Sequence, residues 1–217
     1  MRSSPRSSRV PRENHSDNEH SDNDHIDNEH SETGPFVTTP PFDAPTDADI
    51  AAVSNQLGRP ARNVIGIAAR CVCGAPTVVA TKPRLDDETP FPTLYYLSHP
   101  AATAAVSTLE ATGVMPELAA LLEGETAEAY AAAHEAYLAD RASIEDVPEI
   151  AGISAGGMPS RVKCLHALVG HSLAAGPGVN PIGDLALARC SWSPRVCECA
   201  DYSAAGFSAA QPDGSAG

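Results

Sequence analysis

The chain has little positive charge. Its 217 residues include 14 Lys and Arg against 28 Asp and Glu, which gives a formal net charge of -14. A protein that binds nucleic acid needs a basic face, and the anionic surface of a membrane also attracts basic segments. This balance therefore argues against nucleic acid and against a membrane surface as partners.

Long apolar runs are absent as well. No stretch approaches the roughly 18 consecutive apolar residues of a membrane-spanning helix. The basic N-terminus is not followed by the apolar core of a secretory signal peptide. We therefore expect a cytoplasmic protein without membrane insertion, whose thiols stay reduced. Six cysteines in such a chain favour metal ligands, reactive thiols or core residues over a disulfide framework.

Large apolar side chains are scarce in residues 1–45. Such a segment cannot bury enough surface to offset its ordering entropy, so we expect a disordered tail. It contains a five-residue histidine repeat among Asp, Asn and Glu, made of His15, His20, His25 and His30. The repeat is either a weak site for a transition metal or a solvated duplication without a role. The second alternative is favoured by the period of five, which aligns the rings on neither a helix nor a strand.

Residues 46–190 have the patterns of a single globular domain. Short β-branched runs at 63–70 and 76–82 predict a hairpin with Gly74 in its turn, and residues 91–98 predict a third strand. Ala-rich segments after residue 100 predict helices. Strands followed by helices indicate an α+β fold, with a small antiparallel sheet of about three strands and a mainly helical C-terminal half.

Two further expectations concern these predicted helices. A helix over residues 161–176 has Cys164 in its first turn if Ser160 is the N-cap. His134 lies among polar neighbours in another helix, so we expect it on the surface.

Residues 191–217 consist mostly of small residues and predict a flexible tail. Cys190, Cys197 and Cys199 lie in this tail or at its border. They are either incidental thiols or, at the C-x-C pair Cys197 and Cys199, ligands of a further metal.

Soft metal ligands occur in three parts of the predicted domain. Zinc takes four thiolate or imidazole ligands in a tetrahedron. A C-x-C pair can direct two sulfurs to one ion, and a residue at the start of a helix can complete a site. We therefore predict a zinc site formed by Cys71, Cys73, His99 and Cys164. The alternative for Cys164 is a buried core residue without a metal.

Two histidines follow Cys164 on the same predicted helix. At about 100° per residue Cys164 and His171 share a face, but seven residues rise about 10.5 Å, too far to bind one ion together. We expect His171 and His166 to line the adjacent cleft. A glycine-rich segment precedes this helix and could bind an anion through Gly156, Gly157, Arg161 and Lys163. The alternative is a flexible connector that ends in a serine cap.

Three motifs, taken together, resemble a known family. They are R-C-x-x-G at residues 70–74, L-S-H-P at 97–100 and K-C-L-H-x-x-x-x-H at 163–171. Over residues 50–187 the chain is similar to the bacterial family called domain of unknown function 501, whose pattern has Cys where this chain has His99. The resemblance implies no activity. The members are often encoded near a septum-formation initiator and an exopolyphosphatase, which implies a partner in cell division or envelope maintenance.

Three functions are consistent with these features. The first is a zinc-binding module with a binding or regulatory role. The second is an enzyme for an anionic or phosphorylated small molecule, with His171 as general acid or base because imidazole titrates near neutral pH. The third is a purely structural partner in a cell-division or envelope complex.

Overall fold

The computed structural model describes residues 42–199. Its sheet contains β1 (Val64–Arg70), β2 (Pro76–Thr81) and β3 (Tyr95–Leu97), all antiparallel, in the order β1-β2-β3. Every residue of the central strand β2 is buried. The predicted hairpin and third strand are therefore confirmed, and β3 lies at an edge of the sheet.

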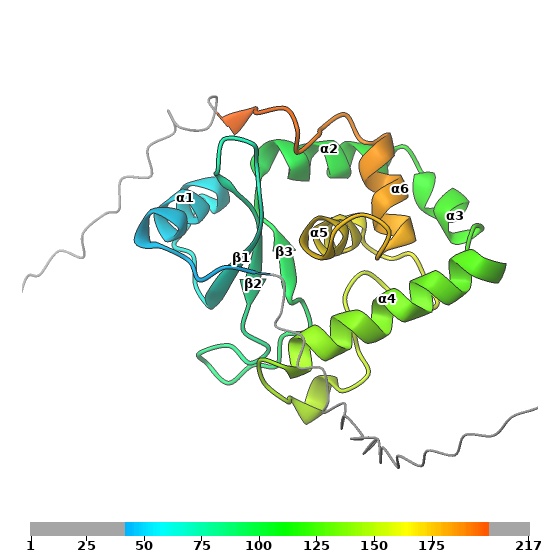
Figure 1. Cartoon of the computed structure of the whole chain (residues 1–217), viewed down its shortest axis with the longest axis horizontal. Coiled ribbons are helices and arrows are strands. Elements are labelled where there is room, and N and C mark those ends of the chain that lie inside the picture. Colours follow the sequence, from blue (N-terminus) through cyan, green and yellow to red (C-terminus); the bar gives the residue numbers. More distant parts are fainter. Residues whose placement is uncertain (1–41, 200–217) are drawn as a thin grey trace, which may run out of the picture. The chain divides into compact units, whose positions relative to one another are not determined.

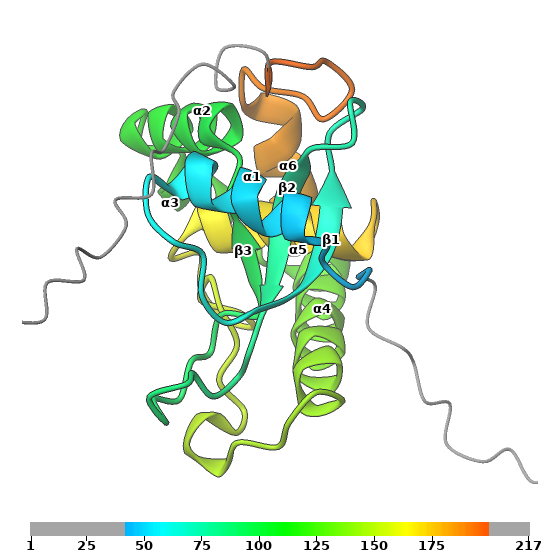
Figure 2. The ribbon, with the colours of Figure 1, turned by 90° about the vertical axis from the view of Figure 1, so that its left-hand side faces the viewer.

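Helix α1 (Asp47–Leu57) covers one face of this sheet (Figures 1 and 2). It begins with a capping box, in which the Thr46 hydroxyl accepts from the Asp49 amide and the Asp49 carboxylate accepts from the Thr46 amide. Val53 on this helix packs against Ile67 and Val79 of the sheet. These contacts fix α1 over the strands that flank the cysteine-containing turn.

The helical half packs on the opposite face of the sheet (Figure 1). Its helices are α2 (Pro100–Ala111), α3 (Val114–Ala119), α4 (Gly124–Ala142), α5 (Leu165–Ala175) and α6 (Pro181–Arg189), with a 3-10 helix, η1 (Pro148–Ile150), between α4 and α5. Helix α5 lies at the centre, against β3, α2 and α6. It approaches β3 so closely that a Cβ atom at Gly170 would lie 3.0 Å from the carbonyl oxygen of Tyr95. The α+β prediction is confirmed.

Helix α5 begins later than its sequence predicts. Its N-cap is Cys164, whereas we expected the helix to begin after Ser160. The preceding residues form a compact turn, in which the amides of Arg161 and Lys163 donate to the carbonyls of Gly157 and Gly156. Those amides are therefore satisfied before a helical turn can form.

The expected surface position of His134 was wrong. Its side chain is only 6% exposed, because His134 shares the buried face of α4 with Tyr130 and Tyr137. The polar neighbour Glu135, which suggested a surface position, is itself exposed.

The predicted tails are described in part. The histidine repeat of the N-terminal tail lies outside residues 42–199. Of the predicted C-terminal tail, residues 191–199 are described, and within them the Trp192 side chain is 2% exposed and belongs to the main hydrophobic core. Between residues 42 and 199, no helix has the length and apolar character that crossing a bilayer requires.

Candidate metal centre

The first C-x-C pair lies in the turn between β1 and β2. The Cys71 amide donates to the Ala75 carbonyl at 2.9 Å, and the Gly74 amide donates to the Cys71 carbonyl at 2.8 Å. Gly74 has a φ of 90°, a conformation that side-chain-bearing residues rarely adopt. This tight turn places two sulfurs at one end of the sheet, with Cys71 buried and Cys73 exposed.

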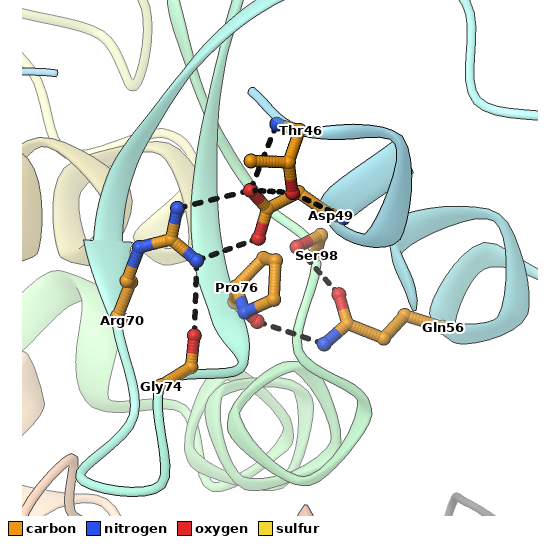
Figure 3. A network of polar contacts seen from close by, with 7 residues as sticks. All are labelled: Thr46, Asp49, Gln56, Arg70, Gly74, Pro76 and Ser98. Atoms are coloured by element: carbon orange, nitrogen blue, oxygen red, sulfur yellow. Dashed lines mark hydrogen bonds and ion pairs between the residues drawn. The ribbon is translucent and has the colours of Figure 1, made fainter. Parts of the chain in front are cut away.

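An ion pair fixes the turn from the side of α1 (Figure 3). The Arg70 guanidinium contacts the two carboxylate oxygens of Asp49 at 2.6 and 3.1 Å. The same guanidinium donates to the Gly74 carbonyl at 2.9 Å. Arg70 therefore connects the capping box of α1 to the turn that carries the cysteines.

The second C-x-C pair reaches this turn from the C-terminal side. After α6 the chain returns towards the β1–β2 turn (Figure 1, orange). Trp192 anchors the returning segment, and its ring lies 5.4 Å from the His99 ring between centroids. Beyond it, a turn closed by the Val196 amide and the Ser193 carbonyl leads to Cys197 and Cys199.

The two pairs form one four-sulfur cluster. The Sγ atoms of Cys71, Cys73, Cys197 and Cys199 all lie within 4.8 Å of one another, and all are free thiols. A tetrahedral zinc ion with Zn–S distances of about 2.3 Å separates its sulfurs by about 3.8 Å. Each sulfur–sulfur distance therefore needs to shorten by no more than about 1 Å for the four to bind one ion.

The surroundings of the cluster shift the pKa values of its thiols in opposite directions. The Ala75 amide, followed by the neighbouring Cys199, lowers the pKa of the Cys73 thiol to about 7. Burial raises the pKa of Cys199. Cys73 is therefore the thiol that most readily supplies a thiolate near neutral pH, and binding a metal would release protons from the others.

His99 supports the cluster from the start of α2. Its Nδ1 atom accepts from the Ala102 amide at 3.4 Å, as an N-cap, and its Nε2 atom lies 3.1 Å from the Sγ atom of Cys199. Because Nδ1 accepts, the proton of the neutral ring is on Nε2 and faces the sulfur. Burial lowers the pKa of His99, which favours this neutral form.

The structure divides the predicted ligand set. It brings Cys71 and Cys73 together with His99 near one cluster, but Cys164 lies in a second group with Glu110 and His166. From the sequence, Cys197 and Cys199 were either incidental thiols of a tail or a further metal pair, and neither was part of the predicted ligand set. The signal that could have identified them is the repetition of the C-x-C spacing in a chain of six cysteines.

The histidine and the glycine-rich segment proposed for an enzyme lie elsewhere. His171 is fully buried between the rings of Tyr95 and Tyr137, 5.8 and 5.1 Å away between centroids. Its Nδ1 atom lies 3.2 Å from Nδ2 of Asn180, and burial lowers its pKa to about 4. The four predicted anion-binding residues all line one cavity of about 480 Å³, namely Gly156, Gly157, Arg161 and Lys163.

A serine motif lies in the same segment and played no role in the predicted sites. Residues 152–156, GISAG, have the G-x-S-x-G spacing of many serine hydrolases. In those enzymes the serine lies on a sharp turn from a strand to a helix, whereas Ser154 lies in a loop after η1. The Ser154 hydroxyl contacts Nδ1 of the buried His134 at 2.8 Å. This contact ties the loop to α4.

Comparison with known proteins identifies a family and nothing more specific. Neither the curated proteins nor the solved structures include a match to this chain. The model of the family described as "Protein of unknown function (DUF501)" matches residues 67–188. The match covers the first C-x-C pair, His99 and Cys164, and ends before the second C-x-C pair. The chain therefore belongs to the domain of unknown function 501 family, as its motifs predicted.

Proposed function

We propose that this chain is a zinc-binding module, in which Cys71, Cys73, Cys197 and Cys199 hold one structural Zn²⁺ ion. The observation that carries the proposal is the convergence of two C-x-C pairs from opposite ends of the domain. Four thiolates in a tetrahedron form a closed zinc site without a position for substrate. The ion would therefore stabilise the fold and would not take part in a reaction.

The ion would control where the C-terminal segment lies. It would cross-link the β1–β2 turn to residues 197–199, which follow the buried Trp192 in the chain. Two apolar side chains are exposed beside the cluster, Val72 at 64% and Val196 at 57%. Zinc binding would hold these two side chains on one surface, which suits a docking site for a protein partner and a binding or regulatory role.

The cellular setting of the proposal rests on chemistry and on family resemblance. Four zinc thiolates and two further free cysteines suit a reducing compartment, so we place the protein in the cytoplasm. The resemblance to a bacterial family encoded near a septum-formation initiator supports a partner in cell division or envelope maintenance. The geometry does not favour an enzyme that uses His171, because this residue is fully buried.

Elemental analysis tests the proposal directly. The full chain, purified under reducing conditions without chelators, is expected to contain one zinc per chain and to lack the visible absorbance of an iron–sulfur cluster. Cys197→Ser should remove the metal. The matched control is Cys190→Ser, since Cys190 lies outside the cluster and contacts the carbonyls of Leu187 and Trp192. A wild-type protein without metal, or a Cys197→Ser protein that keeps it, would contradict the proposal.

A further inference from the structure

A second cluster of reactive side chains lies where α2 meets the start of α5. Glu110 belongs to α2, Cys164 is the N-cap of α5 and His166 lies in the first turn of α5. One ligand atom from each lies within 4.8 Å of those from the other two. None of these three residues belongs to the four-sulfur cluster, so the chemistry of this second cluster does not depend on zinc.

The contacts of His166 define which ring nitrogen acts as a base. Its Nε2 atom lies 3.2 Å from the Thr103 carbonyl oxygen and 3.1 Å from the Ser107 hydroxyl. A carbonyl oxygen can only accept, so the proton of the neutral ring is on Nε2. The Nδ1 atom faces the Glu110 carboxylate at 3.3 Å, so a proton that Nδ1 takes from the neighbouring Cys164 thiol is held in an imidazolium.

Glu110 is positioned to stabilise the protonated ring. Its Oε1 atom lies 3.3 Å from Nδ1 of His166, and the same oxygen accepts from the Leu165 amide at 2.7 Å. The amide fixes the carboxylate at the start of α5. When His166 becomes an imidazolium, Glu110 pairs with it at once.

The charges in this cluster favour a thiolate–imidazolium pair. His166, followed by the Ala167 amide, lowers the pKa of the Cys164 thiol, although burial and the Glu110 charge oppose them. Cys164 and Glu110 raise the pKa of His166, against burial. The two pKa values move towards each other, as they do in enzymes with an activated cysteine.

Cys164 is the residue of this cluster that lines two cavities. Cys164 lines a cavity of about 480 Å³ and a second one of about 300 Å³, whereas His166 lines only the smaller cavity and Glu110 neither. The larger cavity also contains two exposed cations, Arg161 and Lys163.

We propose that Cys164 is a nucleophilic thiolate that accepts an acyl group from a small substrate carrying an anionic carboxylate or phosphate. The thiolate attacks the carbonyl carbon, the bond from that carbon to the leaving oxygen breaks, and the His166 imidazolium gives its proton to the leaving group. Water then attacks the thioester with His166 as base, which releases the acid and restores the thiol. Arg161 and Lys163 hold the anionic group in the larger cavity.

Alkylation by iodoacetamide tests the nucleophile in the full, zinc-loaded chain. Trypsin releases Cys164 in a peptide of residues 164–189 with no other cysteine, so mass spectrometry reports its rate separately from that of Cys190. At pH 7 Cys164 should react at least about tenfold faster than Cys190, because each pKa unit changes the thiolate fraction about tenfold. Equal rates in the wild-type protein would overturn the proposal without any variant.

Substitutions then assign the roles of the neighbours. His166→Asn should slow alkylation of Cys164 at pH 7 about tenfold and shift the midpoint of its pH profile upward. Glu110→Gln should lower the pKa that the profile assigns to His166. The matched control is Glu117→Gln, the same change at an exposed position of α3, which should leave the profile unchanged. An unaltered profile in His166→Asn would overturn the role of His166.

Charged and uncharged probes test the anionic substrate class. The ratio of the alkylation rate with iodoacetate to that with iodoacetamide should be higher for Cys164 than for a free thiol in solution. The double variant Arg161→Gln/Lys163→Gln should lower this ratio to that of the free thiol. Arg59→Gln/Arg62→Gln removes the same charge from another exposed site and should keep the higher ratio. An unchanged ratio in the first variant would overturn the assignment of the cavity.

An activated ester tests the acyl transfer. The mono-4-nitrophenyl ester of succinate should release nitrophenolate and leave a succinyl group on the 164–189 peptide, and Cys164→Ser should abolish this labelling. Absence of both the adduct and any nitrophenolate release that depends on Cys164 would overturn the acyl step. A second zinc equivalent that binds and protects Cys164 from alkylation would instead identify the cluster as a metal site and would also overturn the proposal.

Discussion

The Nε2 atom of His99 lies 3.1 Å from the Sγ atom of Cys199, at the point where the start of α2 meets the C-terminal C-x-C pair. The ring is nearly fully buried and also caps α2 through the Ala102 amide. A hydrogen bond to a ligand sulfur orients it and stabilises its charge. His99 is thus suited to support a four-thiolate site without being one of the ligands.

Replacing His99 by Asn separates these two roles. Asn is a good N-cap, so α2 should keep its cap, but it lacks a donor at the position of Nε2. We expect His99→Asn to retain one zinc and to weaken its binding by about 10- to 100-fold, measured by competition with a chelator. Complete loss of zinc would mean that His99 is itself a ligand, as its sequence position first suggested.

The fluorescence of Trp192 should report metal binding. Trp192 is the single tryptophan of the chain and is 2% exposed. It anchors the segment that carries Cys197 and Cys199, so removal of zinc should loosen this segment and expose the ring. We expect a chelator to shift the emission to longer wavelength, and added zinc to reverse the shift.

A cysteine control distinguishes metal release from other effects of the chelator. Cys197→Ser should show the red-shifted emission without any chelator, whereas Cys190→Ser should behave like the wild-type protein. An emission maximum that is the same with and without metal would show that Trp192 packs independently of the cluster.

Local patterns in the sequence predicted most of the fold. Thr46 and Gly58 cap the two ends of α1, and Gly74, which follows the first C-x-C pair, predicted the turn of the hairpin. These signals are short-range, because each depends on hydrogen bonds between residues a few positions apart. The strands and most of the helices after them follow from such signals.

The candidate site depends on contacts that no local pattern contains. Cys197 and Cys199 meet the turn because Trp192 packs into the core beside His99, a contact between distant parts of the chain. The start of α5 likewise depends on Glu110 of α2, whose carboxylate accepts from the Leu165 amide. For this reason the sequence analysis named two of the four sulfurs, and it did not anticipate that Cys164 lies with Glu110 and His166.

Cys164 should be dispensable for zinc. Its sulfur belongs to the cluster with Glu110 and His166, apart from the four-sulfur cluster. We expect Cys164→Ala to keep one zinc per chain by elemental analysis. The same substitution at Cys71 should abolish binding. Loss of zinc in Cys164→Ala would restore the ligand set predicted from the sequence.

The ion pair between Arg70 and Asp49 should contribute to stability. The guanidinium holds the pKa of the Asp49 carboxyl well below its usual range, mainly through the side-chain hydrogen bonds. A carboxyl whose pKa is lowered by folding stabilises the protein above its unfolded pKa of about 3.9 and loses that contribution as the pH falls.

Asp49→Asn tests this contribution. It should lower the free energy of unfolding in urea at pH 7 by about 1–3 kcal/mol, and the difference from the wild-type protein should shrink below pH 4. Asp86→Asn is the matched control, because Asp86 pairs with Lys82 on the surface and should change stability by less than about 1 kcal/mol. Equal effects of the two substitutions would contradict a special role for the Arg70 pair.

His171 should make the stability of the domain depend on pH between about 4 and 6.5. Burial between Tyr95 and Tyr137 lowers its pKa to about 4, and the carboxylate of Asp184 on α6 only partly opposes this. In the unfolded chain the ring has its ordinary pKa of about 6.5, so the unfolded state binds more protons in this range. Stability is therefore complete above pH 6.5 and falls by about 3 kcal/mol as the pH drops to 4.

His171→Phe removes the titrating group and keeps a planar ring between the two tyrosines. The variant loses the contact between Nδ1 and Asn180, which leaves a buried amide without that partner and should cost about 1–3 kcal/mol at pH 7.5. Because the phenyl ring cannot bind a proton, the penalty should shrink, and then reverse or vanish, as the pH falls towards 4. Urea unfolding of both metal-free proteins at pH 7.5 and 4.5 measures the difference, since zinc release at acid pH would otherwise add to it. Parallel pH dependences in the two proteins would mean that the pKa of His171 is the same in the folded and the unfolded chain, and would contradict the lowered pKa.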